Sequence, residues 1–468
     1  MTQRTEDHPR ISSPRHQAHP IHQTDQTSQT HHPSQTHHPS QTRLLPPPDQ
    51  PIIDLDAHLA WFGPLPYRGT PATLIDEVKA AGLTGRGGAA FPVHRKLSAV
   101  LASAARNKAA RNGRARPIVV GNAAEGEPAS AKDKSLLLLA PHLVLDGLQL
   151  AAQAVGATEA VLYVGMEPAS ADWLDGLIGQ RQATGLDRAP VRLVAAPPRF
   201  IAGQESALVS RISGGPALPM FTPPRVFERG VDGRPTLVQN VETLAHLAQI
   251  ARYGAAWFRA VGTPDEPGTA IWTLRQADGR VEITEAALGT PVTRLLDLRD
   301  TQAVLVGGYH GAWLPAATAA ELSLTNAALR PHGAAVGAGV LAALPASRCG
   351  LAETARIVRY LALESAGQCG PCRNGLPRIA AALADLATVT PDRPLTDPFI
   401  IDDLARWSGL VQRRGACAHP DGTVRLVASA LRTFSGEVDA HLLGRCTAAS
   451  GEPFLPVGPG PVTEKDWR

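Results

Sequence analysis

The chain has 468 residues, 44% of them hydrophobic, which is enough for about three domains with filled cores. Its formal net charge is only +3, which argues against binding nucleic acid through a basic surface. The cysteine count is odd at five, and the N-terminus lacks a signal-peptide apolar core, so we expect a reducing, cytoplasmic compartment. No apolar run reaches the ~18–20 residues needed to span a bilayer, so we expect no direct membrane insertion.

Residues 1–50 form a His-, Gln- and Pro-rich tail of low complexity. The hexamer Ser-Gln-Thr-His-His-Pro begins at Ser28 and at Ser34, and a third copy starts at Ser40. The tail holds eight of the sixteen histidines but few apolar side chains, so burial could not offset the entropy lost on ordering it. We predict a disordered tail. Its histidines form either a metal-binding tract or, as we favour, a solvated segment that binds metal incidentally.

Between residues 51 and 250, helical and strand-like patterns alternate. We predict a helix over 72–82 that ends at a glycine, and a second helix over 143–155. Short buried strands are predicted at 117–121, 160–164 and 191–195. Because strands alternate with helices, this region is predicted to be a layered α/β domain with a mostly parallel sheet.

The remainder of the chain changes pattern twice. Residues 251–338 contain short strand-like runs separated by turn residues, which predicts a small β-rich domain. Residues 339–446 contain four helical segments with short connections, which predicts a helical bundle. These helices are expected at 351–365, 376–386, 398–411 and 424–443. Residues 447–468 are assigned to a C-terminal tail.

A glycine-rich loop at residues 82–92 (Gly-Leu-Thr-Gly-Arg-Gly-Gly-Ala-Ala-Phe-Pro) follows the first predicted helix. Gly85, Gly87 and Gly88 allow the backbone to approach a ligand closely, and successive amide N–H groups in such a loop can bind an anion. Arg86 and Lys96 offer positive charge for a phosphate. An ordinary connection between a helix and a strand also carries glycines, so the loop alone leaves both interpretations open.

Polar side chains follow the predicted strand at 117–121. Asn122, Glu125 and Glu127 lie in the sequence Asn-Ala-Ala-Glu-Gly-Glu-Pro, directly after it. Ligands of open α/β sheets bind at the carboxyl ends of the strands. There the Asn122 amide can bond a ring edge or phosphate, and the carboxylates can accept from sugar-type hydroxyls; two solvated acids in a turn are the alternative. Later segments add similar polar residues: Glu205, Gln239, Asn240 and Thr243.

Cysteines in the predicted bundle suit an iron–sulfur cluster. Cys369 and Cys372 form a Cys-x-x-Cys pair, and Cys417 follows within Arg-Gly-Ala-Cys-Ala-His-Pro. A four-iron cluster normally takes four thiolates, but Ala366 stands one step earlier in the Cys-x-x-Cys spacing. The sequence therefore indicates a cluster site with one ligand missing.

The fourth corner leaves several alternatives open. Water, hydroxide or an external ligand could complete it, or His419 could supply an imidazole. Cys349 and Cys446 are further candidates, although one precedes the first helix of the bundle and the other follows the last. The remaining alternatives are that no stable cluster forms, or that the same cysteines bind zinc.

Together these motifs resemble those of the flavin-carrying, NADH-binding subunit of respiratory complex I and its relatives in soluble hydrogenases and NAD-linked formate dehydrogenases. The resemblance covers about residues 72–443, with four motifs in the family's order. The family's Gly-Arg-Gly-Gly-Ala-Gly-Phe-Pro resembles residues 85–92, with Ala90 in place of the last glycine. The lysine that follows this motif is matched by Lys96.

The other three motifs are similar, with one or two departures each. The family's Asn-Ala-Asp-Glu-Gly-Glu-Pro resembles residues 122–128, with Ala124 in place of the aspartate. Its Gly-Glu-Glu-Thr-Ala-Leu resembles residues 203–208, with Gln204 in place of the first glutamate. Its Asn-Asn-Val-Glu-Thr-Leu resembles residues 239–244.

The resemblance implies a Rossmann-like FMN domain, a small β-grasp domain of the soluble-ligand-binding type and a helical iron–sulfur domain. It implies that Glu127 and Glu205 lie near the nicotinamide and ribose of NADH as catalytic-site residues. The cofactor-binding residues it implies are Gly85, Arg86, Gly87, Gly88, Phe91, Lys96, Asn122, Glu125, Gln239, Asn240 and Thr243. A 4Fe–4S cluster would be held by Cys369, Cys372 and Cys417.

The implied activity is hydride transfer from NADH to FMN, followed by single-electron transfer through the cluster to a ferredoxin-like or complex I-like partner subunit. The protein would be cytoplasmic or peripheral to a membrane complex through that partner. Ala99 and Arg225 stand where the family has aromatic side chains that stack the adenine, and Arg225 would suit a phosphate and favour NADPH or another partner. Two alternatives remain: a flavoprotein electron-transfer module that no longer uses NADH, and a cofactor-free scaffold subunit.

Overall fold

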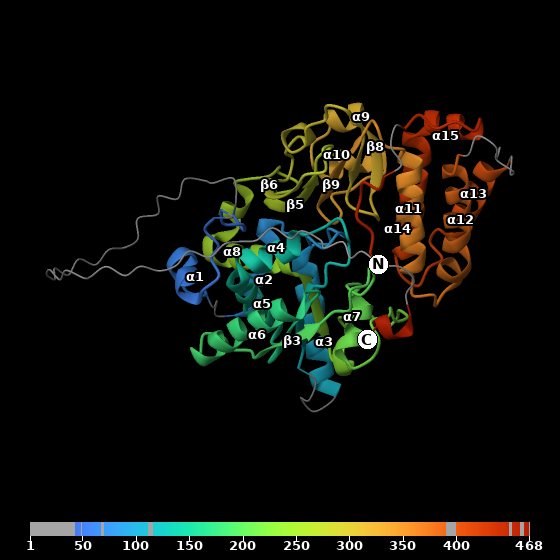
Figure 1. The fold of residues 1–468 in the computed structure, drawn as a ribbon. Coiled ribbons are helices and arrows are strands. Elements are labelled where there is room, and N and C mark those ends of the chain that lie inside the picture. The colour runs from blue at the N-terminus through green and yellow to red at the C-terminus, as the bar shows by residue number, and fades with distance from the viewer. Residues whose placement is uncertain are drawn as a thin grey trace, which may run out of the picture. The chain divides into compact units, whose positions relative to one another are not determined.

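The computed structural model describes residues 43–47, 49–66, 70–110, 116–389, 399–448, 452–458 and 463–467 (Figure 1). Contacts divide the chain into two units, Met1–Ser40 and Gln41–Arg468, and every element below belongs to the second. The tail predicted for residues 1–50 lies largely outside the described residues, so that prediction stays untested.

A four-stranded parallel sheet has the order β3-β2-β1-β4. Its strands are β1 (Ile118–Ala123), β2 (Ala160–Val164), β3 (Val191–Ala195) and β4 (Thr236–Asn240). The chain runs outward from β1 to β3 and then crosses back to β4 on the other side of β1. The strand order therefore reverses between β1 and β4, and ligands of open α/β sheets bind at such a reversal.

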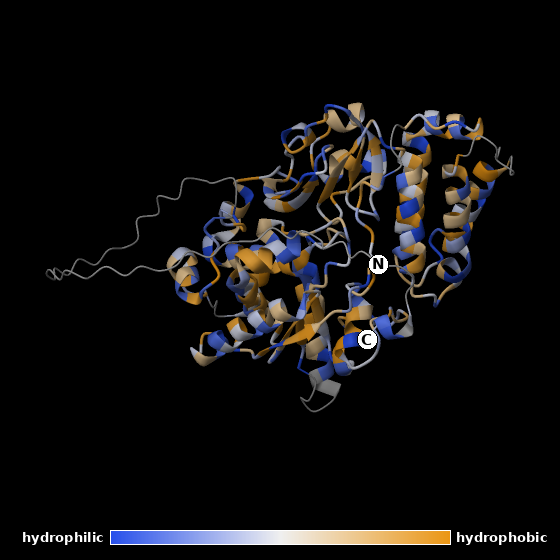
Figure 2. Cartoon of the chain, viewed as in Figure 1, coloured by the Kyte–Doolittle hydropathy of each residue, from blue (hydrophilic) through white to orange (hydrophobic). Residues whose placement is uncertain are grey.

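Helices cover both faces of this sheet. They are α1 (Leu55–Phe62), α2 (Pro71–Ala81), α3 (Val93–Ala110), α4 (Lys132–Leu139), α5 (Pro141–Val155), α6 (Pro168–Ala183), α7 (Glu205–Ile212) and α8 (Val241–Arg259). One face packs against α2, α3, α5 and α8, whereas α7 packs on the other. Figure 2 shows that the strands between these layers are mainly hydrophobic. Helix α8 runs through residue 250, at which the sequence placed a domain boundary.

A second sheet has five strands in the order β6-β5-β9-β7-β8. The strands are β5 (Thr269–Arg275), β6 (Val281–Ala287), β7 (Thr301–Val306), β8 (Ala312–Pro315) and β9 (Val340–Pro345). Only the β5–β9 pair is parallel among these pairs. Because β9 is its central strand, this sheet extends past residue 338, where the predicted β-rich domain ended. The short helices α9 (Ala316–Ala320) and α10 (Asn326–Leu329) lie between β8 and β9.

The last helices form a bundle whose apolar core also includes side chains of β7, β8 and β9 (Figure 1). They are α11 (Gly350–Leu363), α12 (Leu376–Ala387), α13 (Ile400–Val411), α14 (His419–Thr433) and α15 (Ser435–Leu442). The single helix predicted over 424–443 is wrong, because the helix breaks at Phe434 and begins five residues earlier, at His419. The other three predicted helices occur within a few residues of their expected positions.

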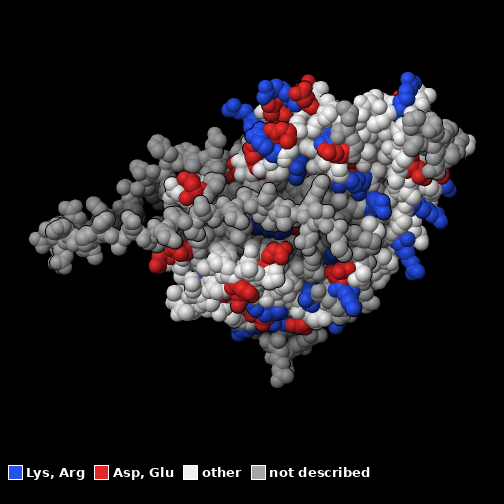
Figure 3. All heavy atoms as spheres, in the orientation of Figure 1, with Lys and Arg blue, Asp and Glu red and all other residues white. Residues whose placement is uncertain are grey.

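Surface charge follows the balanced composition. On the face drawn in Figure 3, basic and acidic side chains are interspersed. Exposed pairs contribute to this mixing, such as Arg280 with Asp278, whose charged atoms lie 2.7 Å apart. Among the described helices, none by itself has the length and apolar character to cross a bilayer, although the bent α4–α5 pair has both. Nearly every side chain of α5 is buried inside the protein.

Candidate nucleotide and iron–sulfur sites

The glycine loop precedes α3 and packs against the junction of β4 and α8. It closes on itself through the Gly85 N–H, which donates to the Phe91 carbonyl at 2.9 Å. A Cβ on Gly87 would lie 3.1 Å from the Asn240 Cβ, and Gly88 has φ +103°, so both positions favour glycine. The Phe91 side chain is 46% exposed at the end of the loop. At the point where the strand order reverses, the loop therefore offers a ligand its backbone and the aromatic ring of Phe91.

Arg86 has a different role from the phosphate contact predicted for it. Its backbone N–H donates to Thr243 Oγ1 at 2.8 Å. Its guanidinium is buried and donates to the carbonyls of Thr269 at 3.1 Å and Pro267 at 3.3 Å. Arg86 and Thr243 therefore fasten the loop to α8 and to the second sheet. The sequence could not show this, because the partners lie more than 150 positions away.

Lys96, Asn122 and Glu205 lie together at the carboxyl end of the parallel sheet. Lys96 Nζ lies 2.8 Å from Glu205 Oε1, and both side chains are partly exposed, 33% and 43%. Asn122 Nδ2 donates to the Gly203 carbonyl at 2.9 Å, which fixes the turn before Glu205. Gln204 caps α7 by accepting backbone N–H groups, so this departure from the family motif still supports the helix that carries Glu205.

The acids that follow β1 have separate roles. Glu125 accepts from the backbone N–H groups of Asp133 and Lys134, each at 3.0 Å, and thereby caps α4 instead of facing a ligand as predicted. Glu127 Oε2 accepts from the Tyr309 N–H at 2.8 Å, which joins this turn to the second sheet. Burial raises the pKa of Glu127 to about 7, although its backbone hydrogen bonds act in the opposite direction.

A buried charged cluster beside the loop was missed from the sequence. Lys132 Nζ lies 2.7 Å from Asp133 Oδ1, 2.8 Å from Glu242 Oε2 and 3.3 Å from Asn240 Oδ1. Burial opposes the charge on Lys132, but the carboxylates of Asp133 and Glu242 hold its pKa above the ordinary value. Glu242 also accepts from the Ile271 N–H at 2.9 Å. The cluster holds Asn240 in place and ties α8 to β5.

Donor groups at this end of the sheet fit an anionic nucleotide. Gln239 Nε2 is buried without a hydrogen-bond partner in the part of the chain that the structure describes. Leaving such a group unpaired typically costs about 1–3 kcal/mol, which an acceptor on a ligand would recover. The partly exposed Lys96 ammonium supplies positive charge nearby and also donates to the Val238 carbonyl of β4 at 3.2 Å. These observations fit FMN at the strand reversal.

Cys369, Cys372 and Cys417 come together in the bundle. Cys369 and Cys372 lie between α11 and α12, the latter within the π-helical turn Pro371–Gly375, and Cys417 precedes α14. Burial and the neighbouring thiols of Cys369 and Cys417 raise the pKa of Cys372. The three thiols are therefore near one another, as three corners of a single cluster require.

None of the protein ligands considered for the fourth corner is available. His419 Nε2 donates to the Leu361 carbonyl at 2.8 Å, and its Nδ1 lies 3.1 Å from His310 Nε2, so both ring nitrogens are engaged. Cys349 caps the opposite end of α11, which has 14 residues and is about 20 Å long. Cys446 lies beside Cys349. We therefore remove three residues from the candidates for the fourth cluster ligand: His419, Cys349 and Cys446.

An α/β nucleotide site joined to a three-cysteine helical site is typical of flavin- and iron–sulfur-containing electron-transfer subunits. Comparison with known families agrees with this class. The Nuo51 FMN-binding domain matches residues 78–249, and the NADH-ubiquinone oxidoreductase-F iron–sulfur binding region matches residues 352–441. The chain belongs to the family of NADH-quinone oxidoreductase F subunits.

Individual relatives span most of the chain. The NADH-quinone oxidoreductase F subunit of Rickettsia bellii is 26% identical over 388 residues, which are 79% of this chain and 90% of that protein. The corresponding F 2 subunit of Rhizobium meliloti is 28% identical over 391 residues, 80% of this chain and 89% of that protein. A chain of NAD+-reducing NiFe hydrogenase in its H2-reduced state has a TM-score of 0.70 and 30% identity. That match covers 80% of this chain but 63% of the hydrogenase chain.

Proposed function

We propose that this chain is an NADH-oxidising, FMN- and iron–sulfur-carrying subunit of an electron-transfer complex. The observation that carries the proposal is the meeting of Lys96, Asn122 and Glu205 with Asn240 where the strand order reverses, inside the region that matches the FMN-binding domain. When bound, FMN accepts a hydride from NADH and releases the electrons one at a time.

The side chains at the strand reversal would bind and position the cofactor. The Lys96 ammonium would neutralise negative charge on FMN, and Gln239 Nε2 would donate to it. Asn122 holds the turn before Glu205, so that this carboxylate stays at the rim of the site. Arg86 keeps the glycine loop in place by donating to the Thr269 carbonyl.

NADH would enter beside the same loop. The exposed ring of Phe91 offers a surface on which an adenine can stack, and such a contact is typically worth about 0.5–1.5 kcal/mol. Glu205 is exposed enough to accept from a ribose hydroxyl. Glu127, in contrast, already accepts a hydrogen bond from the Tyr309 N–H. We therefore assign Glu205 to ribose binding and Glu127 to shaping the site.

The bundle would pass electrons onward from a cluster on Cys369, Cys372 and Cys417. A water or other external ligand would complete the corner that Ala366 leaves open. We assign the second sheet to the β-grasp module of the family and the bundle to its iron–sulfur domain. A ferredoxin-like or complex I-like subunit would accept the electrons, which would place this chain at the periphery of a membrane complex.

Replacing the cation at the flavin site tests the proposal. Lys96→Met should lower the FMN bound per purified chain at least about tenfold, because a charge-assisted contact of about 1.5–3 kcal/mol is lost. Released flavin is quantified by fluorescence. The control is Lys79→Met, which removes an exposed lysine from the last turn of α2 and should leave the flavin content unchanged. Equal flavin in both variants would remove Lys96 from the site.

A further inference from the structure

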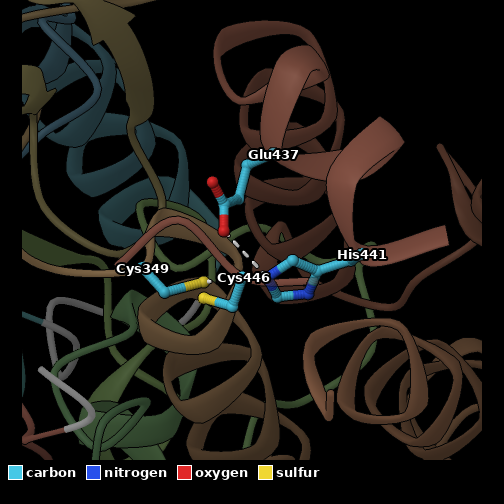
Figure 4. Close-up of side chains that lie close together, drawn as sticks. All are labelled: Cys349, Glu437, His441 and Cys446. Atoms are coloured by element: carbon cyan, nitrogen blue, oxygen red, sulfur yellow. Dashed lines mark hydrogen bonds and ion pairs between the residues drawn. The ribbon is translucent and has the colours of Figure 1, made fainter. Parts of the chain in front are cut away.

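Four potential metal ligands meet at the end of the bundle opposite the three-cysteine site. They are Cys349, Glu437, His441 and Cys446 (Figure 4), and their ligand atoms all lie within 4.8 Å of one another. Glu437 and His441 are four residues apart on one face of α15, Cys349 caps α11, and Cys446 follows α15. Three separate segments of the chain thus converge on one point.

The histidine of this group is oriented for metal binding. His441 Nδ1 lies 2.9 Å from the Leu386 carbonyl, which can only accept, so Nδ1 carries the proton. In the neutral imidazole, Nε2 is then a bare acceptor, 2.9 Å from Glu437 Oε1 and 3.6 Å from Cys349 Sγ. Two acceptors at that distance need a proton or a cation between them. A carbonyl that fixes the tautomer is also the usual outer partner of a metal-bound histidine.

We propose that Cys349, Glu437, His441 and Cys446 bind one Zn2+ ion in a closed structural site. Two thiolates, one imidazole and one carboxylate make up the four-coordinate N, S and O set that zinc prefers. Thiolate ligands select against Mg2+ and Ca2+, which take oxygen ligands. The Thr447 N–H donates to Glu437 Oε1 at 3.1 Å and helps to orient the carboxylate.

Burial at the site suits a permanently bound ion. Cys349 and His441 are buried, whereas Cys446 is exposed and gives the ion a route of entry. The ion would tie the start of α11 to α15 and to the segment after it. Because the iron–sulfur cysteines lie beyond the other end of α11, about 20 Å away, this site is separate from the cluster and independent of the proposed function.

Metal analysis of the full-length protein, purified without chelators, tests the proposal. We expect zinc to fall by one ion per chain in Cys446→Ser and in the Cys349→Ser/Cys446→Ser double variant, relative to wild type. Zinc-edge X-ray absorption of the wild-type protein should show two sulfur neighbours at about 2.3 Å, absent from the double variant. The His-rich tail is present in every sample and offers nitrogen ligands, so it cannot produce the sulfur signal.

Two features of the experiment keep it decisive. Serine at position 349 can still cap α11, and Cys446 is exposed, so both variants should fold. The matched control, Cys372→Ser/Cys417→Ser, removes thiols of the other site and should retain the zinc and its sulfur neighbours. The proposal is overturned if Cys446→Ser keeps the wild-type zinc and sulfur signal, or if only the control loses them. A Cys349–Cys446 disulfide found by mass spectrometry in anaerobically purified protein would equally overturn it.

Discussion

Glu127 connects the chemistry of one side chain to the stability of the fold. Its pKa is about 7 in the folded protein against 4.5 ordinarily, because it is buried between the two sheets. Between these values the folded protein keeps a proton that the unfolded chain has lost, so its stability falls as the pH rises through this window. The Glu127→Gln side chain cannot ionise. Between about pH 5 and about pH 8, we expect the free energy of unfolding to fall by about 2 kcal/mol less in this variant than in the wild type.

Apparent melting temperatures of both proteins at the two pH values check this prediction. Glutamine keeps an oxygen that can accept from the Tyr309 N–H, so the contact between the turn and the second sheet should survive. The same pH dependence in wild type and variant would show that Glu127 is ionised throughout and that its burial costs little.

Residue types near the site could be predicted from sequence, but their partners could not. Asn122 follows from the rule that ligands bind at strand ends, and Lys96 from its place after the glycine loop; the structure brings both together with Asn240. From the sequence, Arg86 and Glu125 are equally suited to bind a ligand. In the structure, however, Arg86 donates to a distant backbone carbonyl and Glu125 caps α4. Ala90 replaces a family glycine and still adopts φ +49°. Because this left-handed conformation is uncommon for alanine, the motif alone would not have predicted it.

The turn after α11 determines how many thiolates the cluster site has. Ala366 lies three residues before Cys369, between the end of α11 and the π-helical turn. Ala366→Cys would add a thiolate at the corner that water or an external ligand would otherwise fill. Because an iron held only by water or an external ligand is released more readily than one held by a thiolate, we expect the variant to keep closer to about four iron atoms per chain and the cluster to survive oxygen for longer.

Iron and acid-labile sulfide assays of anaerobically purified protein measure this change. Ala366→Ser is the control, since it introduces a similar volume without a thiol. If the cysteine and serine variants hold equal iron, then position 366 does not face the cluster, and the missing-ligand interpretation fails.

Elements with a clear period were predicted well, and alanine-rich ones were not. Strands β1, β2 and β3 occur where their short apolar runs indicated. Strand β9, Val-Leu-Ala-Ala-Leu-Pro, consists of residues that suit a helix equally, and its pairing with β5 and β7 is set by tertiary contacts. The break at Phe434 has only Gly436 beside it as a signal, and that glycine lies inside α15 rather than between the two helices.

Across the whole molecule, one buried ion pair joins the α/β layers to the bundle. Arg199 Nη1 lies 2.9 Å from Glu364 Oε1, and the side chains are 6% and 1% exposed. The Phe200 N–H also donates to Glu364 at 2.9 Å, directly before the cluster turn. Glu364→Ala would leave a buried guanidinium without its carboxylate, and we expect a loss of about 3–5 kcal/mol.

Denaturant unfolding of the full chain measures this loss. The control is Asp403→Ala, which breaks an exposed pair with Arg406 at 2.8 Å on α13 and should cost less than about 1 kcal/mol. Equal effects of the two substitutions would mean that the α/β layers and the bundle do not depend on the buried pair. Sequence patterns do not reveal such long-range pairs. They did predict the order of the three regions along the chain: α/β, β-rich and helical.

The central claim is that this chain oxidises NADH through a bound flavin and passes the electrons to its bundle. An anaerobic visible spectrum of the purified protein, recorded before and after adding NADH, tests it most directly. We predict flavin bands that bleach with NADH, above a broad absorbance that belongs to the iron–sulfur cluster. A flavin that dithionite reduces but neither NADH nor NADPH does, or a colourless protein that takes up no FMN, would contradict the claim.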